Sequence, residues 1–340
     1  MKVLKNEPLD KHTSFRVGGP AKVYVVPEDE YELQKLIEFL HSEKLLYDII
    51  GNGTNLLVSD EGVDSVVIEI GKALDGIEFV SGEGNRNCKA DDKISETGNV
   101  GKDENRGHIA GEKKHDSETG ADMSECGDAD GRIYRIRALA GTSLGKTAQF
   151  AANHSLTGME ALRGIPGTVG GAVTMNAGAY GTEMKDVLES VEVLTKDGSL
   201  KKLPAAALKL GYRYSIVPEE GYVVVAATFA LKKGDKKLIE AEMADYQQRR
   251  KDKQPIEKFS AGSTFKRPEG HFAGKLIEDC GLRGYKHGGA EVSEKHCGFV
   301  INDGTARAAD IYWLIGEIRK RVLMEQGVML TPEVKLWGNF

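Results

Sequence analysis

Two glycine-rich segments of the sequence could bind an extended ligand that contains phosphate. The first, GNGTNLLVSD, covers residues 51–60 and follows a short apolar run. Backbone N–H groups remain accessible in such a loop, and pyrophosphate oxygens accept hydrogen bonds from them. The segment has neither the GK[ST] ending of a Walker A loop nor the GxGxxG spacing of a Rossmann fold. By itself it is therefore equally consistent with a structural turn.

The second segment, RGIPGTVGGAVTMNAGAYG at residues 163–181, is more specific. Its six glycines alternate with small residues, and such a stretch lets a ligand or another part of the chain approach the backbone closely. A tight crossing of glycine-rich strands is the structural alternative. A segment this long with so little bulk is costly to bury unless a ligand fills the space. Together the two segments favour an extended dinucleotide such as FAD.

Three polar clusters supply groups that could act on a substrate. Arg213 stands between tyrosines in GYRYS, Ser263 follows a glycine in SAGSTFKRP, and Glu333 lies in LTPEVKLWG, which we predict to be an apolar strand. An acid in such a strand either faces solvent or is deliberately desolvated. Singly, the three residues are better explained as a surface cation, a turn residue and an outward-facing strand residue. A chemical role depends on their combination.

Strands and helices are expected to alternate around these motifs. Leu33, Leu36, Ile37 and Leu40 recur with the period of an amphipathic helix. A second helical stripe, near the end of the sequence, precedes a glycine that can cap it; the stripe is Ile311, Leu314, Ile315, Ile318 and Val322, and the glycine is Gly327. Strands are predicted at residues 22–26, 47–50, 64–70, 133–140 and 222–231.

Three local structures follow from turn and capping residues. Ser143 is expected to cap a helix that runs to about residue 154. Residues 191–203 are expected to form a hairpin, with positive φ angles at both Asp197 and Gly198. A charged helix is expected from Lys232 onward, through RRKDKQP at residues 249–255.

Residues 81–130 differ from the rest of the chain. They contain no Leu, Phe, Trp or Tyr and have an excess of acidic residues. Such a segment cannot bury enough apolar surface to offset its ordering entropy, so we predict a disordered surface insertion between two strands. It contains possible zinc ligands, but their spacing fits no compact finger and we expect no metal site; they are Cys88, His108, His115 and Cys126. Cys280 and Cys297 are expected to be reduced and partly buried.

Length and charge limit the possible classes of protein. A chain of 340 residues is expected to form two or three domains. A net charge of −6 argues against a nucleic-acid or anionic-membrane partner. No apolar run is long enough to span a bilayer, and the first residues have no apolar core like that of a signal peptide. We therefore expect a cytoplasmic protein that is a monomer or a weak oligomer.

Taken in order, the motifs resemble those of one family. KHTSFRVGGPA (11–21), the two glycine-rich segments, the three polar clusters, RRKDKQP and AGKLIEDCGLRG (273–284) are similar in content and order to the UDP-N-acetylenolpyruvoylglucosamine reductase (MurB) family. The resemblance covers nearly the whole chain except residues 81–130, where that family has a short connection. The short interval between Arg213 and Ser263 resembles the compact, second type of the family.

The resemblance implies an α+β fold. A two-part FAD-binding module of the p-cresol methylhydroxylase/vanillyl-alcohol oxidase type would precede a C-terminal α+β substrate domain. The expected domains are FAD-binding subdomain 1 at residues 1–70, joined by the C-terminal strand at 331–340, FAD-binding subdomain 2 at 71–231, and a substrate-binding domain at 232–330.

The resemblance also implies a reaction and a role for each polar cluster. The enzyme would use FAD and NADPH to reduce the enolpyruvyl ether of UDP-N-acetylglucosamine to UDP-N-acetylmuramate. Arg213 and Glu333 would polarise the substrate carboxylate, with Glu333 protonated or sharing a proton, and Ser263 would protonate the substrate carbon. Neither glycine-rich segment contains a histidine or cysteine that could tether the flavin, so FAD is expected to bind non-covalently.

Binding residues are expected in the same motifs. FAD contacts are expected from Gly51, Asn52, Gly53, Thr54, Asn55, Gly141, Gly164, Ile165, Pro166, Gly167, Gly170, Gly171, Ala172, Asn176, Ala177, Gly178 and Arg249. Substrate contacts are expected from Tyr180, Lys253, Lys266, Arg267 and Arg283. For the four basic residues, solvation at the surface is the alternative.

Two other functions remain open on the sequence alone. One is a flavin oxidase of the same fold that acts on another substrate, such as a sugar alcohol. The other is a non-catalytic protein that binds a nucleotide sugar or a flavin. The polar clusters argue against the first, and loss of flavin colour on addition of NADPH would exclude the second.

Overall fold

A computed structural model describes residues 1–80 and 131–340 of the chain. The predicted insertion at residues 81–130, with its two cysteines and two histidines, lies outside the described residues. The described residues on either side of it lead into neighbouring antiparallel strands, because Phe79 in β6 (Ile77–Phe79) pairs with Ile136 in β7 (Ile133–Leu139). Among the described residues, no helix is long and apolar enough to cross a membrane.

The N-terminal part of the chain forms a mixed four-stranded sheet. Its strand order is β1 (Lys2–Pro8), β2 (Pro20–Val26), β5 (Val63–Glu69) and β3 (Tyr47–Ile50). Helix α1 (Glu30–Ser42) begins after Asp29, whose side chain accepts a hydrogen bond from the backbone N–H of Glu32. The four apolar residues of the predicted stripe are buried in this helix. The sequence therefore predicted this strand–helix–strand order correctly, but it missed β1.

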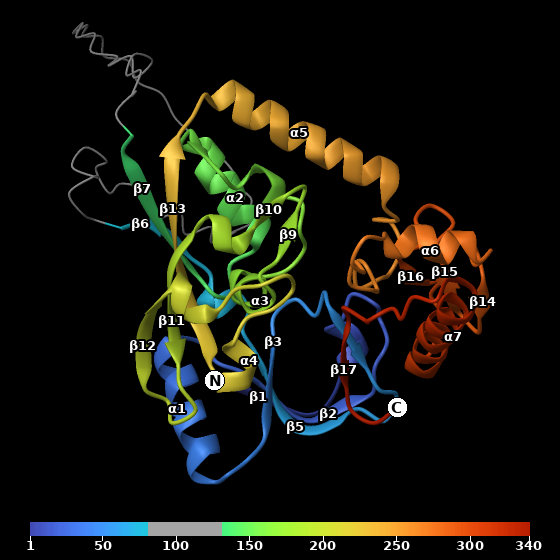
Figure 1. Ribbon diagram of the computed structural model, residues 1–340. Coiled ribbons are helices and arrows are strands. Elements are labelled where there is room, and N and C mark those ends of the chain that lie inside the picture. The colour runs from blue at the N-terminus through green and yellow to red at the C-terminus, as the bar shows by residue number, and fades with distance from the viewer. Residues whose placement is uncertain (81–130) are drawn as a thin grey trace, which may run out of the picture.

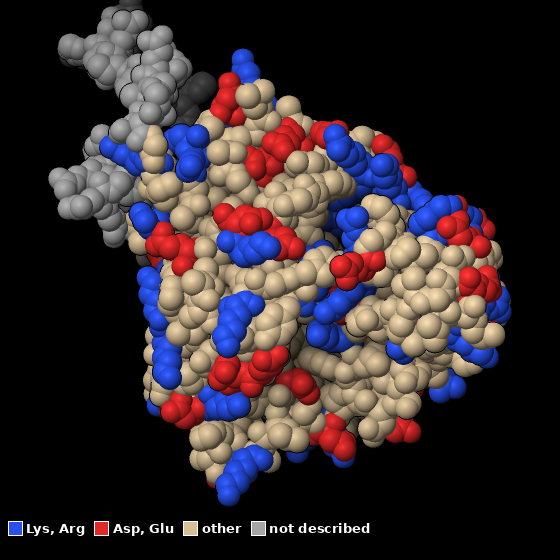
Figure 2. Space-filling view, in the orientation of Figure 1, with Lys and Arg blue, Asp and Glu red and all other residues tan. Residues whose placement is uncertain are grey.

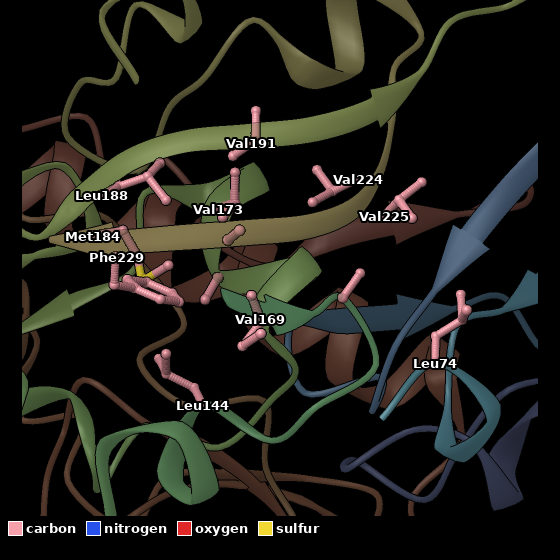
Figure 3. Packing of buried hydrophobic residues seen from close by; sticks show 14 of the residues in the cluster. Leu74, Leu144, Val169, Val173, Met184, Leu188, Val191, Val224, Val225 and Phe229 are labelled. Atoms are coloured by element: carbon pink, nitrogen blue, oxygen red, sulfur yellow. The ribbon is translucent and has the colours of Figure 1, made fainter. Parts of the chain in front are cut away.

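A larger antiparallel sheet forms the centre of the molecule. Its strand order is β12 (Leu200–Pro204), β11 (Leu188–Leu194), β13 (Val223–Lys233), β7 and β6, with β8 (Leu156–Thr157) paired to the end of β13. Helices α2 (Leu144–Asn153) and α3 (Val169–Met175) pack against it. Figure 3 shows side chains of both helices and of the sheet, among them Leu144, Val169 and Phe229, gathered in one core.

The structure corrects three local predictions and adds one helix that was not predicted. Ser143 occupies the N-cap of α2, but its side chain makes no capping hydrogen bond. In the hairpin between β11 and β12, Gly198 has a φ of 82° while Asp197 is not among the described residues with positive φ. The charged helix begins later than expected, because β13 continues to Lys233 before α5 (Lys236–Lys253) starts. The second glycine-rich segment contains a helix, α3, that its composition did not indicate.

Helix α5 leads from the central sheet to a C-terminal lobe (Figure 1). The lobe contains α6 (Ala273–Asp279), the small sheet β14 (Lys286–His287), β15 (Ala290–Val292) and β16 (Val300–Asn302), and α7 (Ala308–Gln326). As predicted, α7 buries its apolar stripe and ends at Gly327, which has a φ of 70°. Cys280 and Cys297 are free, as predicted, but they are buried and not partly buried.

The chain then returns to its N-terminal part. Strand β17 (Lys335–Trp337) pairs in parallel with β4 (Leu56–Val58), which lies within the first glycine-rich segment. Phe15, Val17 and Leu57 of the N-terminal part also share a hydrophobic core with the C-terminal lobe. The hydrophobic cores thus cross the predicted domain boundaries, and the division at residues 70 and 231 remains a prediction.

Candidate active site

The three polar clusters, far apart in the sequence, meet at one place. The backbone N–H of Glu333 donates to the carbonyl of Thr264 at 2.9 Å, and that of Lys266 donates to the carbonyl of Thr331 at 2.9 Å. These bonds lay the Ser263 segment alongside the Glu333 segment. The GYRYS segment joins them, because the hydroxyl of Tyr212 accepts a hydrogen bond from the backbone N–H of Arg267 at 3.1 Å.

Arg213 and Glu333 form a direct ion pair at this meeting point. Arg213 Nε lies 2.8 Å from Glu333 Oε1, and the two side chains are only 18% and 15% exposed. Arg213 Nη2 donates to the carbonyl of Gly178 at 2.8 Å, which connects the pair to the second glycine-rich segment. A guanidinium held at both ends in this way presents a fixed fork of donors.

The environment of Glu333 favours a protonated carboxyl more than an exposed position would. Burial raises its pKa, and the charges of Arg213 and Lys266 act in the opposite direction without cancelling that effect. The prediction that Glu333 lies in a strand is wrong, because β17 begins two residues later. Asn55 bonds this segment at two points. Its Nδ2 donates to the carbonyl of Glu333 at 3.2 Å, and its backbone carbonyl accepts from the N–H of Lys335 at 3.0 Å.

Ser263 lies in the exposed turn that follows Gly262, whose φ is 74°. Its Oγ donates to the carbonyl of Phe265 at 3.2 Å. Within the described residues no hydrogen bond joins Ser263 to Arg213 or Glu333 directly. The backbone pairing of the neighbouring Thr264 with Glu333 is what brings the hydroxyl into the same region.

The two glycine-rich segments contact each other. Thr54 Oγ1 donates to the carbonyl of Pro166 at 3.3 Å. A Cβ added at Gly51 would lie 2.5 Å from Thr168 Oγ1, so the loops could not approach as closely with a larger residue. Gly164 and Gly171 lie exposed beside this junction. The pair of loops therefore offers accessible backbone on one continuous surface, which suits a ligand as long as a dinucleotide.

Packing within the protein explains other glycines that we predicted to contact a cofactor. At Gly53, where φ is 59°, an added Cβ would lie 1.9 Å from the carbonyl oxygen of His12. At Gly141 it would lie 2.0 Å from the carbonyl oxygen of Gly71. These two positions are closed to a side chain by backbone, whether or not a ligand binds nearby.

A cavity of about 600 Å³ lies next to the glycine-rich segments. It is bounded by Thr54, Gly164 and Pro166 on one side and by α5 and residues such as Gly262 and Phe299 of the C-terminal lobe on the other. Figure 2 shows Lys and Arg side chains around the hollow between the central body and this lobe. Arg213, Ser263 and Glu333 are not among the residues that line it, although Gly262 precedes Ser263.

The sequence singled out Arg249 but overlooked its neighbour Arg250. Arg249 is exposed and pairs with Asp245 on the same helix at 2.7 Å. Arg250 instead donates to the carbonyl of Gly164 and lines the cavity, and burial lowers its pKa. Helical spacing could have identified it, because Arg250 lies seven positions after the buried Met243 and therefore on the same face of α5.

We expect Arg250→Ala to lower the free energy of unfolding by about 1.5–3 kcal/mol, the usual range for losing a hydrogen bond from a charged group. The cause is loss of the contact between α5 and the glycine-rich segment at Gly164. Arg249→Ala is the matched control and should change it by no more than about 0.5 kcal/mol. Urea denaturation of both variants would measure the difference, and equal effects would contradict the anchoring role of Arg250.

The remaining predicted substrate residues divide into near and distant groups. Lys266 influences the pKa of Glu333, and Arg267 is tied to Tyr212, so both lie at the meeting point of the clusters. Tyr180 stacks on Tyr246 of α5, with ring centroids 4.5 Å apart.

Two other basic residues make no bond to the ion pair in the part of the chain that the structure describes. Lys253 is exposed at the end of α5. Arg283 pairs with Glu278 at 2.7 Å. Neither forms a hydrogen bond or ion pair with Arg213 or Glu333 within the described residues. Their predicted role in substrate binding therefore remains a prediction.

Comparison with known proteins identifies relatives over nearly the full length. Residues 254–337 match the family described as UDP-N-acetylenolpyruvoylglucosamine reductase, C-terminal domain, and residues 121–204 match the family described as FAD binding domain. A protein of Agathobacter rectalis named UDP-N-acetylenolpyruvoylglucosamine reductase is 47% identical, with 99% of this chain and 95% of the relative covered. One of Listeria monocytogenes with the same name is 40% identical, with 98% and 94% covered.

A solved structure is similar as well. The crystal structure of UDP-N-acetylenolpyruvylglucosamine reductase from Thermus caldophilus superimposes with a TM-score of 0.69 at 33% identity, covering 99% of this chain and 98% of that one. These matches confirm the predicted α+β fold with an FAD-binding module followed by a C-terminal domain of this type.

Proposed function

Because this chain belongs to the UDP-N-acetylenolpyruvoylglucosamine reductase family of FAD-dependent oxidoreductases in peptidoglycan synthesis, we propose that it reduces UDP-N-acetylenolpyruvoylglucosamine to UDP-N-acetylmuramate with NADPH as co-substrate. The proposal includes non-covalent FAD, a cytoplasmic location and a monomeric or weakly associated state. The observation that carries it is the partly buried Arg213–Glu333 pair, in which burial raises the pKa of the acid.

The residues present fit FAD. The contact between Thr54 and Pro166 joins the two glycine-rich segments into one surface, on which Gly164 and Gly171 expose their backbone. We assign this surface to the diphosphate of the cofactor, whose oxygens would accept backbone N–H bonds. When bound, FAD supplies the hydride that the reduction requires.

Arg213 and Glu333 suit the charge that forms on an enolpyruvyl substrate. Hydride addition to the outer carbon of the double bond places negative charge on the inner carbon and on the carboxylate attached to it. Arg213 is always cationic and is fixed by Glu333 and by the carbonyl of Gly178. A protonated Glu333 would share its proton with that carboxylate, and groups arranged in advance of the reaction stabilise such charge strongly.

Ser263 would complete the reaction by giving its hydroxyl proton to the inner carbon. A serine is a weak acid in water, but the carbon that it faces would be strongly basic. Lys266, which lies near enough to influence Glu333, could assist the transfer. Lys266 and Arg267 are also the best-placed candidates to contact the substrate diphosphate, and Tyr180, Lys253 and Arg283 are kept as further candidates.

An anaerobic absorbance experiment tests the proposal. The protein carrying FAD should lose its flavin colour when NADPH is added and regain it when UDP-N-acetylenolpyruvoylglucosamine follows. UDP-N-acetylglucosamine, which has no enolpyruvyl group, is the control and should not restore colour. Bleaching without recovery would indicate a flavin oxidoreductase with another substrate, and failure to bleach would indicate a binding protein.

A further inference from the structure

Arg213 adopts a backbone conformation that its own residue type does not favour. It lies between Gly211 and Tyr214, which exchange backbone hydrogen bonds of 3.0 and 3.1 Å, and its φ is 54°. Positive φ is strained for a non-glycine residue, so such a turn persists only where its surroundings determine it. The contacts that hold this turn therefore also determine where the guanidinium lies.

The end of α3 supplies these contacts. Asn176 Nδ2 donates to the carbonyl of Gly211 at 2.8 Å, at the base of the turn. Ser215 Oγ donates to the carbonyl of Thr174 at 2.6 Å, just after the turn. The bond from Arg213 Nη2 to the carbonyl of Gly178 adds a third connection to the same stretch. The turn that carries Arg213 is thus fastened at three points to residues 174–178.

Asn176 is itself held firmly. It is fully buried and ends α3 with a φ of 42°. Besides Gly211, its Nδ2 donates to Glu183 Oε2 at 3.0 Å, and its Oδ1 accepts from the N–H of Lys185 at 3.0 Å. Both amide protons are therefore used within the protein, which leaves this side chain no donor for a cofactor.

We infer that Asn176 is a positioning residue for Arg213, and not the direct FAD ligand that the sequence suggested. It fixes the arginine turn relative to the glycine-rich segment and so sets the position from which Arg213 meets Glu333 and the substrate carboxylate. The inference rests on the proposed function, because it expects loss of the Asn176 amide to slow the step in which the substrate is reduced.

Asn176→Gly is the variant that tests the inference. Glycine adopts the positive φ freely, so the backbone conformation is retained while the amide bonds are lost. With FAD bound, reduction of the flavin by NADPH should keep its rate, and reoxidation by the enolpyruvyl substrate should slow by about 10²-fold, the scale of a misplaced catalytic group. Asn6→Gly is the matched control, because Asn6 is exposed on β1 with a φ of 52°; it should slow neither step.

Making the same substitution in the Glu333→Gln protein distinguishes a positioning role of Asn176 from general damage to the structure. If Asn176 acts through the Arg213–Glu333 pair, Asn176→Gly should slow reoxidation by less than about threefold when Glu333→Gln is already present, because coupled residues are not additive. A full 10²-fold loss in both backgrounds would overturn the inference. The inference would also be overturned by a larger dissociation constant for FAD, by equal slowing of flavin reduction and reoxidation, or by an unchanged rate of reoxidation. Failure of the unaltered protein to regain colour would contradict the proposed function instead.

Discussion

Glu333→Gln should lower the turnover number by two to three orders of magnitude while the protein keeps its FAD. The change is nearly isosteric and leaves an amide donor, but an amide cannot share a proton with the substrate carboxylate. Loss of one preorganised stabilising group typically costs about 2.7–4 kcal/mol of transition-state stabilisation. Flavin reduction by NADPH should persist, because no negative charge forms on the enolpyruvyl group in that step. Stopped-flow absorbance would measure the two steps separately.

The pH dependence provides an independent check on this role. Burial raises the pKa of Glu333, so its protonated form persists to higher pH than that of an exposed glutamate. Activity that requires the protonated form is lost as pH rises through the folded-state pKa, and this loss should disappear in Glu333→Gln. Glu43→Gln, the same change at an exposed position after α1, should be silent. A turnover number for Glu333→Gln within about twofold of the parent would rule out the assigned role.

Ser263→Ala should separate the two halves of the reaction. Proton transfer by a positioned side chain contributes typically about 10²–10⁴-fold, and reoxidation by the enolpyruvyl substrate should slow by at least this factor. Flavin reduction by NADPH should remain nearly unchanged, since protonation occurs only after hydride has reached the substrate. The serine hydroxyl bonds only the nearby carbonyl of Phe265 among the described residues, so its removal should leave the fold intact.

Ser42→Ala is the matched control for this variant. Ser42 Oγ donates to the carbonyl of Phe39 at 2.8 Å on the exposed end of α1, in a similar local contact. It should change neither step. If Ser263→Ala slowed both steps equally, Ser263 would not be the acid, and a water or Lys266 would have to supply the proton.

Elements with a clear hydrophobic period were predicted well from the sequence. The stripe from Leu33 to Leu40 and the stripe before Gly327 both became buried faces of helices. Where glycine dominates, periodicity is lost, and α3 was missed for this reason. Its start depends on Thr168, which accepts a hydrogen bond from the N–H of Gly171 at 3.4 Å, and its end depends on the positive φ of Asn176.

The candidate site could be listed from the sequence but not assembled. Motif content identified Arg213, Ser263 and Glu333, yet only tertiary hydrogen bonds through Thr264, Asn55 and Tyr212 bring them together. Asn176 was predicted as an FAD contact, and its partners within the protein, the carbonyl of Gly211 among them, are not visible in its local sequence.

The pairing of β17 with β4 has a consequence for how the protein is made. A nascent chain that has reached residue 300 contains β4, both glycine-rich segments and the Arg213 turn, but it lacks both Glu333 and the strand that pairs with β4. Domains tend to fold in order as they leave the ribosome, so we expect the surface proposed for FAD to form before Arg213 can pair with Glu333. Synthesis of the last segment would then complete the pair, and an incomplete chain could carry flavin without reducing the substrate.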